Sequence, residues 1–189
     1  MIAIIEAIKN GEIPNAEVAL VISNNPQAPA LEKAAKYGIE TMVQTADGFS
    51  NREDYDRALI EKLESRGVDI VCLAGFMRIM SPVFVHHYKN RCLNIHPALL
   101  PSFPGLHAQR KALEYGVKFS GATVHFIDEG VDSGPIIIQE VVPVLDDDTE
   151  ETLAARILEK EHKIYPEAIR LLVEGKLEIQ GRRVLRKKD

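Results

Sequence analysis

Val68-Asp69-Ile70-Val71-Cys72-Leu73-Ala74 is the stretch of sequence on which the fold depends. Its residues are almost all apolar and do not alternate with polar ones, so it predicts a central strand buried on both faces. An amphipathic helix is predicted directly before it over residues 51–66, and Gly67 is typical of a helix end. A helix followed by a fully buried strand is typical of an α/β fold with a mostly parallel sheet.

The same alternation of short apolar runs and longer helical patterns continues on both sides of this stretch. Further strands are predicted over residues 18–23, 40–44, 92–95, 122–126 and 135–142, with a terminal hairpin over 177–185. Further helices are predicted over residues 2–10, 28–37, from 82, over 107–115 and over 148–173. The last helix is expected to begin with a capping box of Asp148 and Glu151. No repeat, linker or low-complexity tract interrupts the pattern, which favours a single domain over residues 1–189.

Composition narrows the class of protein. The net charge of −5 and the pI near 5.7 exclude the basic surface typical of nucleic-acid binding. The two cysteines, Cys72 and Cys92, lie in apolar runs without CxxC spacing, which indicates buried free thiols in a reducing compartment. The sequence shows neither the pattern of a signal peptide nor a run near the ~18 apolar residues of a membrane helix. We therefore expect a cytoplasmic protein with no nucleic-acid or membrane partner.

Asn94 and His96 are placed at the carboxyl end of the strand predicted over residues 92–95. Side chains two apart on a strand point to the same side, so this pair should face one way while Ile95 faces the core. Ligands of open α/β sheets bind beyond the carboxyl ends of the strands. Taken alone, however, the tripeptide fits a histidine satisfied within a strand-to-loop turn better than a catalytic one.

Asp132 lies in Val131-Asp132-Ser133-Gly134-Pro135, directly before an apolar strand. In isolation such an aspartate most often caps a turn. If the loop folds over the edge that carries His96, the two residues form an acid–base couple in which the carboxylate favours the protonated imidazole. Acyl transfer to an amine needs that couple and also donors for an oxyanion, which the Asn94 amide and His96 would supply.

Residues 75–80 follow the most buried strand and carry unusually large apolar side chains for a loop. Phe76, Met77, Ile79 and Met80 fit a slot for a flat heteroaromatic ring, although a loop that packs on a helix is the simpler interpretation. No cluster of histidine and acidic residues has the spacing of a metal site. No serine or cysteine lies in a nucleophile-elbow pattern.

In combination, these segments resemble the glycinamide ribonucleotide formyltransferases of purine biosynthesis. The signature over residues 93–101 departs from the family only by the small residue Ala98. The other matching segments are residues 73–80, 103–109, 121–126, 131–137 with Gln139, and 160–162 followed by Tyr165 and Pro166. They occur in order and at family-like spacing from about residue 3 to the C-terminal hairpin.

The resemblance implies a Rossmann-like fold with helices on both faces of the sheet. It implies transfer of the formyl group of 10-formyltetrahydrofolate to the amine of 5'-phosphoribosylglycinamide, through a tetrahedral intermediate and without a metal or an acyl-enzyme. Asn94, His96 and Asp132 match the family's catalytic trio, with His96 as general acid and oxyanion stabiliser. Both expected partners are small molecules, and the protein is expected to be a monomer or a homodimer.

The resemblance also implies two sets of binding residues. Those expected to contact the folate are Arg52, Met77, Arg78, Ile79, Met80, Asn94, Asp128, Glu129, Gly130 and Val131. Those expected to contact the ribonucleotide acceptor are Gly75, Leu158, Glu159, Lys160 and Glu161.

One departure concerns the N-terminal end. The family has a first strand and a glycine-rich turn whose backbone amides hold the acceptor's phosphate. Here Met1 falls just inside the helix that follows, so the chain is expected to lack both, and the natural protein is expected to begin upstream. Two alternatives in function stay open: a formyltetrahydrofolate deformylase, and a catalytically silent, folate-binding truncated homologue. A methionyl-tRNA formyltransferase would normally carry a further C-terminal domain and a basic surface.

Overall fold

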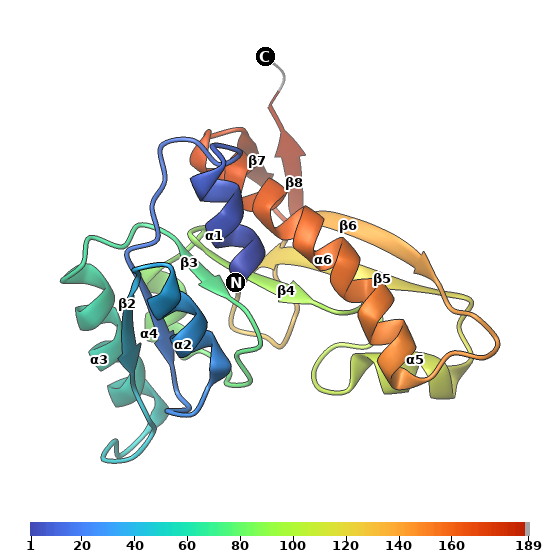
Figure 1. Cartoon of the computed structure of the whole chain (residues 1–189), viewed down its shortest axis with the longest axis horizontal. Helices are drawn as coiled ribbons and strands as arrows, with labels where there is room; N and C mark the ends of the chain where they lie inside the picture. The colour runs from blue at the N-terminus through green and yellow to red at the C-terminus, as the bar shows by residue number, and fades with distance from the viewer. Residues whose placement is uncertain (188–189) are drawn as a thin grey trace.

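The computed structural model describes residues 1–187, so residues 188 and 189 of the predicted domain lie outside the described part. Its strands form two sheets (Figure 1). The smaller sheet pairs β1 (Leu20–Ser23) with β2 (Glu40–Val43) in parallel. The larger sheet has the order β3-β4-β5-β6-β8-β7, with β3 (Val71–Leu73), β4 (Cys92–His96), β5 (Phe119–Phe126), β6 (Ile136–Pro143), β7 (Leu177–Gln180) and β8 (Arg183–Arg186). The predicted α/β fold and terminal hairpin are confirmed.

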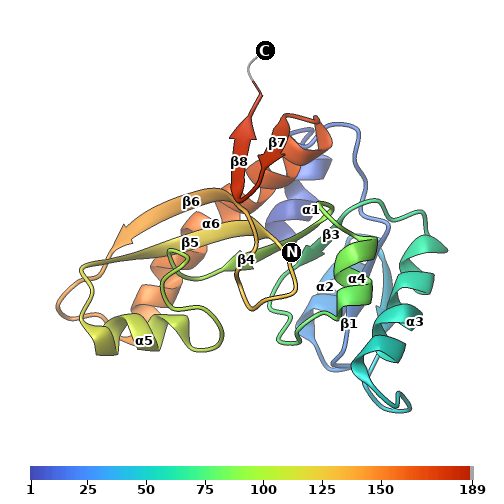
Figure 2. The same ribbon diagram turned by 180° about the vertical axis from the view of Figure 1, so that it is seen from behind.

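Helices cover both faces of the sheets, as expected. The helices α1 (Ile2–Lys9), α2 (Pro29–Lys36) and α6 (Glu150–Val173) lie on the face turned to the viewer in Figure 1. The helices α3 (Arg52–Glu64) and α4 (Pro82–His87) lie on the opposite face, which Figure 2 shows. The remaining helix, α5 (Ala108–Tyr115), packs against α6 beside the far end of the larger sheet.

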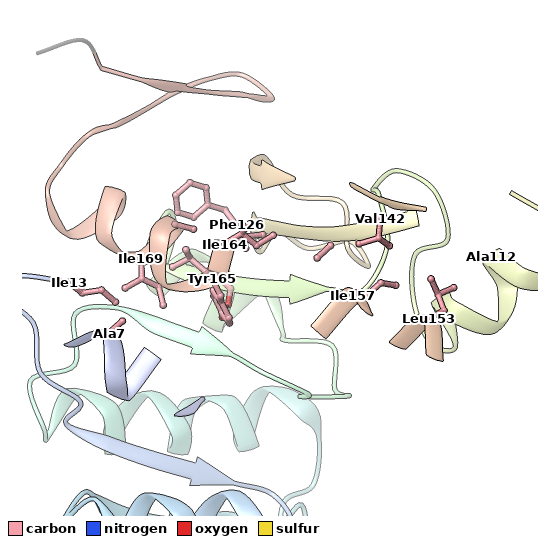
Figure 3. Packing of buried hydrophobic residues seen from close by; sticks show 14 residues of the cluster. Ala7, Ile13, Ala112, Phe126, Val142, Leu153, Ile157, Ile164, Tyr165 and Ile169 are labelled. Atoms are coloured by element: carbon pink, nitrogen blue, oxygen red, sulfur yellow. The ribbon is translucent and has the colours of Figure 1, made fainter. Parts of the chain in front are cut away.

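Two apolar clusters fill the space under these helices. The larger cluster lies between α6 and the strands β4 to β6, and Figure 3 shows Ile157 and Tyr165 of α6 pointing into it together with Phe126 and Val142. The smaller cluster lies under α3 and α4 and includes Tyr55. Apolar residues of α6 recur every three or four positions along one face, so one side of this long helix is buried while the other stays polar.

The stretch over residues 68–74 differs from its prediction. Only Val71–Leu73 forms a strand, and its side chains are half buried. Within residues 1–187, β3 pairs with β4 alone, so its other edge has no strand partner. A central strand has a partner strand along each edge and helices over both faces. One edge of β3 has no such partner, so its side chains are covered only in part.

The capping of α6 also differs from its prediction. Thr149 rather than Asp148 is the N-cap, and Thr152 rather than Glu151 completes the capping box. The Thr149 side chain accepts a hydrogen bond from the Thr152 amide, while Asp148 forms an ion pair with Arg156 at 2.7 Å. The backbone turns into the helix one residue later than the sequence pattern indicated, and caps are sensitive to such a shift. No helix within residues 1–187 is long and apolar enough to span a membrane.

Candidate active site

Strands β4 and β5 supply the polar side chains of the candidate site. Their antiparallel register places His125 opposite Asn94 and Thr123 opposite His96. Residues directly opposite each other in such a ladder point to the same face, and so do residues two apart. Four polar side chains therefore share one face of the sheet, in strands that are otherwise apolar.

Asp132 reaches this face from the loop between β5 and β6. Its Oδ1 accepts a hydrogen bond from Nδ2 of Asn94 at 3.3 Å, and its Oδ2 lies 3.3 Å from Nδ1 of His96. The Oδ2 atom also accepts a hydrogen bond from the backbone N–H of Gly105 at 2.8 Å. The structure thus brings the predicted trio together and confirms that Asn94 and His96 face the same side.

The geometry of the loop over residues 127–135 follows from its own residues. Asp128 Oδ1 accepts hydrogen bonds from the Gly130 amide and the Ser133 hydroxyl, which closes a tight turn. A Cβ atom on Gly134 would overlap the carbonyl oxygen of Phe126, so only glycine fits there. Asp132 itself has a φ of +50°, in the left-handed region that aspartate tolerates better than most residues.

A second loop, over residues 97–107, closes the other side of the site. Thr123 holds its beginning, because the Thr123 hydroxyl donates to the Ala98 carbonyl at 2.7 Å and accepts from the Leu100 amide at 3.1 Å. Gln139 of β6 donates to the Leu100 carbonyl at 2.9 Å. Further along, the Phe103 carbonyl oxygen lies 2.9 Å from Nε2 of His96. Buried polar groups of the sheet therefore set the path of this loop.

Burial and charge shift the titration of the acid–base couple. The His125 ring lowers the pKa of Asp132 to about 2, with further contributions from the Gly105 N–H and from His96, all opposing the effect of burial. The pKa of His96 is lowered overall, because burial outweighs the opposing effects of the Phe103 carbonyl and the Asp132 charge. Asp132 is therefore ionised at neutral pH, and its charge favours the protonated form of His96.

The segment over residues 75–80 is held by α3. The Arg78 guanidinium lies over the Tyr55 ring at 4.4 Å from its centre, and the Ser81 amide donates to Asp56 at 2.6 Å. Met77 is 73% exposed, while Met80 is 6% exposed and belongs to the smaller apolar cluster. The Met80 side chain therefore packs inside the protein, as the simpler interpretation has it, whereas Met77 is open to solvent.

Exposed apolar side chains nevertheless remain available in this segment. Met77 and Ile79 both point outward, as residues two apart in an extended segment do. Gly75, at the start of the segment, has a φ of +66° that glycine adopts freely. Two further residues expected to contact folate are also exposed, Arg52 at the start of α3 and Val131 in the Asp132 loop. Glu129, in the same loop, pairs with His86 of α4 at 2.9 Å.

The residues of α6 expected to contact the acceptor do not share one face. The hydroxyl oxygen of Tyr165 lies 2.7 Å from the Leu73 carbonyl oxygen and 3.1 Å from that of Leu93, so this face of α6 covers β3 and β4. Glu161, one turn earlier, lies on the same face, and burial raises the pKa of its carboxyl group. Glu159 lies about 200° around the helix from Glu161 and is exposed.

The other two members differ in direction, since Leu158 lies within about 60° of Glu161 around the helix and Lys160 about 100° from it. Lys160 pairs with Glu140 of β6 at 3.5 Å, and Leu158 is 46% exposed. Four consecutive residues span about 300° of a helix, so they cannot all contact one ligand through their side chains.

His125 is the site residue that sequence reasoning missed. It is 2% exposed, and its Nε2 lies 3.3 Å from Nδ2 of Asn94 and 3.6 Å from Oδ1 of Asp132. The available signal was the spacing of Thr123 and His125, two polar residues two apart in an apolar strand. That is the same pattern that Asn94 and His96 form in β4.

The part of the chain that the structure describes contains no group of three or more histidine, cysteine, aspartate or glutamate side chains arranged to hold a metal ion. A large hollow lies between α1 and α6, where Glu6, His162 and Arg170 are among the lining residues. No member of the trio lines it, so it is separate from the polar cluster on β4 and β5.

The chain is similar to known proteins over most of its length. Residues 1–169 match the protein family described as formyl transferase. The chain is 47% identical over 177 residues to phosphoribosylglycinamide formyltransferase of Escherichia coli (strain K12), an alignment that covers 94% of this chain and 83% of the relative. It is 50% identical over 161 residues to the trifunctional purine biosynthetic protein adenosine-3 of Drosophila melanogaster.

The two kinds of relative differ in length. The aligned part covers 85% of this chain but spans only 12% of the trifunctional relative. Among solved structures, glycinamide ribonucleotide transformylase 1 from Symbiobacterium toebii has 52% sequence identity to the chain and a TM-score of 0.96. That match covers 98% of this chain and 87% of the other, so the similarity extends over nearly the whole described fold.

Proposed function

The chain belongs to the formyl transferase family, and we propose that it transfers the formyl group of 10-formyltetrahydrofolate to the amine of 5'-phosphoribosylglycinamide in de novo purine biosynthesis. The observation that carries the proposal is the contact of Asp132 with both Asn94 and His96 on one face of the sheet. The names of the relatives identify the acceptor class, and the site supplies the groups that the transfer requires.

The proposed reaction is a direct attack. The amine nitrogen forms a bond to the formyl carbon, and the carbonyl electron pair moves to oxygen. The bond from that carbon to the folate nitrogen then breaks, the folate nitrogen gains a proton and the amine nitrogen loses one. His96 in its protonated form stabilises the oxyanion and donates the proton, while the ionised Asp132 takes up the amine proton through water.

The Asn94 side-chain amide already has hydrogen-bond partners in the site, which the sequence did not indicate. Its Nδ2 already faces Oδ1 of Asp132 and Nε2 of His125, both at 3.3 Å. The two N–H bonds of the amide thus hold the cluster together. Donation to the oxyanion requires that one of these hydrogen bonds be exchanged when substrate binds.

The residues proposed to bind folate and acceptor are chosen by the family resemblance and by the exposure of their side chains. We propose that Met77 and Ile79 contact the pterin ring, that the backbone of residues 78–80 and of the loop over residues 128–131 reads its edge, and that Arg52 contacts the rest of the folate. Gly75 and the side of α6 that carries Glu161 are proposed to contact the acceptor. The single domain, the cytoplasmic location and the monomeric or homodimeric state remain predictions from the sequence.

Product formation with and without acceptor tests the proposal. The chain is incubated with 10-formyltetrahydrofolate in the presence or absence of 5'-phosphoribosylglycinamide, and both tetrahydrofolate and formylated product are measured. We expect product only when acceptor is present. Tetrahydrofolate released equally well without acceptor would instead indicate a deformylase, and bound folate with no turnover in either mixture would indicate a silent binder.

A further inference from the structure

Both ring nitrogens of His96 face defined partners. Nε2 lies 2.9 Å from the Phe103 carbonyl oxygen, and Nδ1 lies 3.3 Å from Oδ2 of Asp132. A carbonyl oxygen has only lone pairs, so it accepts a hydrogen bond only if Nε2 carries the hydrogen. Turning the ring over would place carbon atoms against both oxygens, so the two contacts together determine the ring orientation. The Asp132 carboxylate also only accepts, so a neutral ring donates to one of the two partners, and the shorter contact, 2.9 Å against 3.3 Å, is that of Nε2 with the Phe103 carbonyl.

We propose that Phe103 is a positioning residue whose backbone carbonyl keeps the proton of neutral His96 on Nε2, so that Nδ1 is the ring atom that gains and loses a proton during formyl transfer. The inference rests on the proposed function for the transfer step. The position of the proton, in contrast, depends only on the contacts around the ring.

The backbone around Phe103 is built to hold this carbonyl in place. Phe103 has a φ of +54°, in the left-handed region that phenylalanine rarely adopts. Its ring anchors the turn by packing on the larger apolar cluster and against Tyr115, with ring centres 5.9 Å apart. Lys111 of α5 donates to the next carbonyl, that of Pro104, at 3.1 Å. Three separate contacts therefore support one unusual turn.

The same turn serves both members of the acid–base couple. Two residues after Phe103, the Gly105 amide donates to Oδ2 of Asp132 at 2.8 Å. One short segment thus accepts a hydrogen bond from Nε2 of His96 and donates one to Asp132, whose carboxylate faces Nδ1 of His96. This arrangement fixes the ring and the carboxylate relative to each other.

In His125, the nitrogen that faces a backbone carbonyl is Nδ1 rather than Nε2. Its Nδ1 lies 2.8 Å from the Phe126 carbonyl oxygen, so its proton belongs on Nδ1. In the neutral ring Nε2 then accepts a hydrogen bond from Nδ2 of Asn94, which also donates to Asp132, and only the protonated ring stabilises the Asp132 carboxylate, whose Oδ1 is 3.6 Å away. The Nδ1 hydrogen of His125 is thus bound to a backbone carbonyl and its Nε2 faces Asn94, so we take His96 as the ring that exchanges the proton.

Nitrogen-15 NMR of the histidine rings tests the inference without substrate. Spectra of labelled protein are recorded at a pH above the titration of His96, where the ring is neutral. We expect His96 to carry its proton on Nε2 and His125 to carry its proton on Nδ1, so the second ring is an internal control. A proton on Nδ1 of His96, or a mixture of the two forms, overturns the proposal.

A variant of the turn tests the role of Phe103. Phe103→Gly removes the ring that anchors the turn, and we expect His96 to become a mixture of tautomers while kcat falls on the order of tenfold and KM for the folate changes little. Ser102→Ala, at the exposed neighbouring position, is the matched control and should leave both the spectrum and kcat unchanged. Retention of a pure Nε2 form in Phe103→Gly would show that the Phe103 ring does not hold its carbonyl against His96. A wild-type chain with the expected tautomer but no formyl transfer would contradict the proposed function alone.

Discussion

Asp132 has the largest number of polar contacts in the site, since its two oxygens face Asn94, His96, His125 and the Gly105 amide. Its carboxylate is the only negative charge in that group, so every neighbour either donates to it or lies close enough to be stabilised by it. Single side chains on this face should therefore affect turnover far more than they affect folate binding.

Replacing His96 with alanine should lower kcat by ~10² or more, because the general acid and oxyanion stabiliser is lost. Steady-state transfer kinetics measure the effect, and binding of folate, followed by fluorescence or calorimetry, should change little. Near-normal turnover in His96→Ala would remove His96 from the proposed mechanism.

Met77 should act on binding rather than on chemistry. Its side chain is 73% exposed in the structure, and truncation in Met77→Ala should weaken folate binding by about 1–3 kcal/mol through lost apolar contact. The matched control is Leu145→Ala, which truncates another exposed apolar side chain on the connection between β6 and α6. Equal folate affinity of the two variants would contradict the assignment of Met77 to the pterin site.

At the level of elements, the strands carry the site and the loops complete it. β4 and β5 align their polar residues by register, whereas the loops over residues 97–107 and 127–135 bring the Phe103 carbonyl and Asp132 onto that face. The buried Thr123 connects a strand to a loop, since its hydroxyl belongs to β5 and its partners are backbone groups of the loop over residues 97–107. The start of α6 supplies no side chain to this face, so its capping should be separable from activity.

Thr149→Ala tests that separation. The variant removes the side-chain acceptor at the N-cap of α6 and should reduce the free energy of unfolding by about 1 kcal/mol. Urea denaturation measures the change, and Thr149→Ser, which keeps the hydroxyl, should be close to wild type. A loss of kcat in Thr149→Ala without any loss of stability would mean that the start of α6 affects the site directly.

At the level of the whole molecule, the site joins parts of the chain that are distant in sequence. Asp132 connects a loop after β5 with β4 and with the loop that follows β4, so its ionisation should contribute to the stability of the fold as well as to catalysis. The ion pair of Asp148 with Arg156 likewise lowers the pKa of Asp148, at the opposite end of the larger sheet.

The acid dependence of unfolding should reflect Asp132. Its pKa is lowered from 3.8 to about 2 in the folded chain, so the stabilisation is present above about pH 4 and is lost as the pH falls through 2. Asp132→Asn should lack this part of the pH dependence while keeping that due to Asp148. Parallel denaturation curves for wild type and variant between pH 2 and 5 would contradict this expectation.

Much of the fold could be predicted because its signals are local. The alternation of helices and strands, the terminal hairpin and the shared face of Asn94 and His96 follow from periodicities within a few residues. The same reasoning misplaced the cap of α6 by one residue and overestimated the strand over residues 68–74. Those errors concern boundaries and burial, which depend on neighbours that the local pattern does not contain.

The residue types of the trio and, through the family resemblance, the reaction that they suit could both be predicted from the chain before it was folded. Tertiary structure alone decided that Asp132 meets His96, that His125 joins them, that the Met80 side chain is buried and that the Phe103 carbonyl faces Nε2 of His96. The two kinds of feature differ because some depend on neighbouring residues and others on residues far apart in the sequence. Side-chain direction repeats with the period of its own strand, whereas contacts between strands and loops depend on the register of β4 with β5 and on the paths of two loops, which only the packed fold specifies.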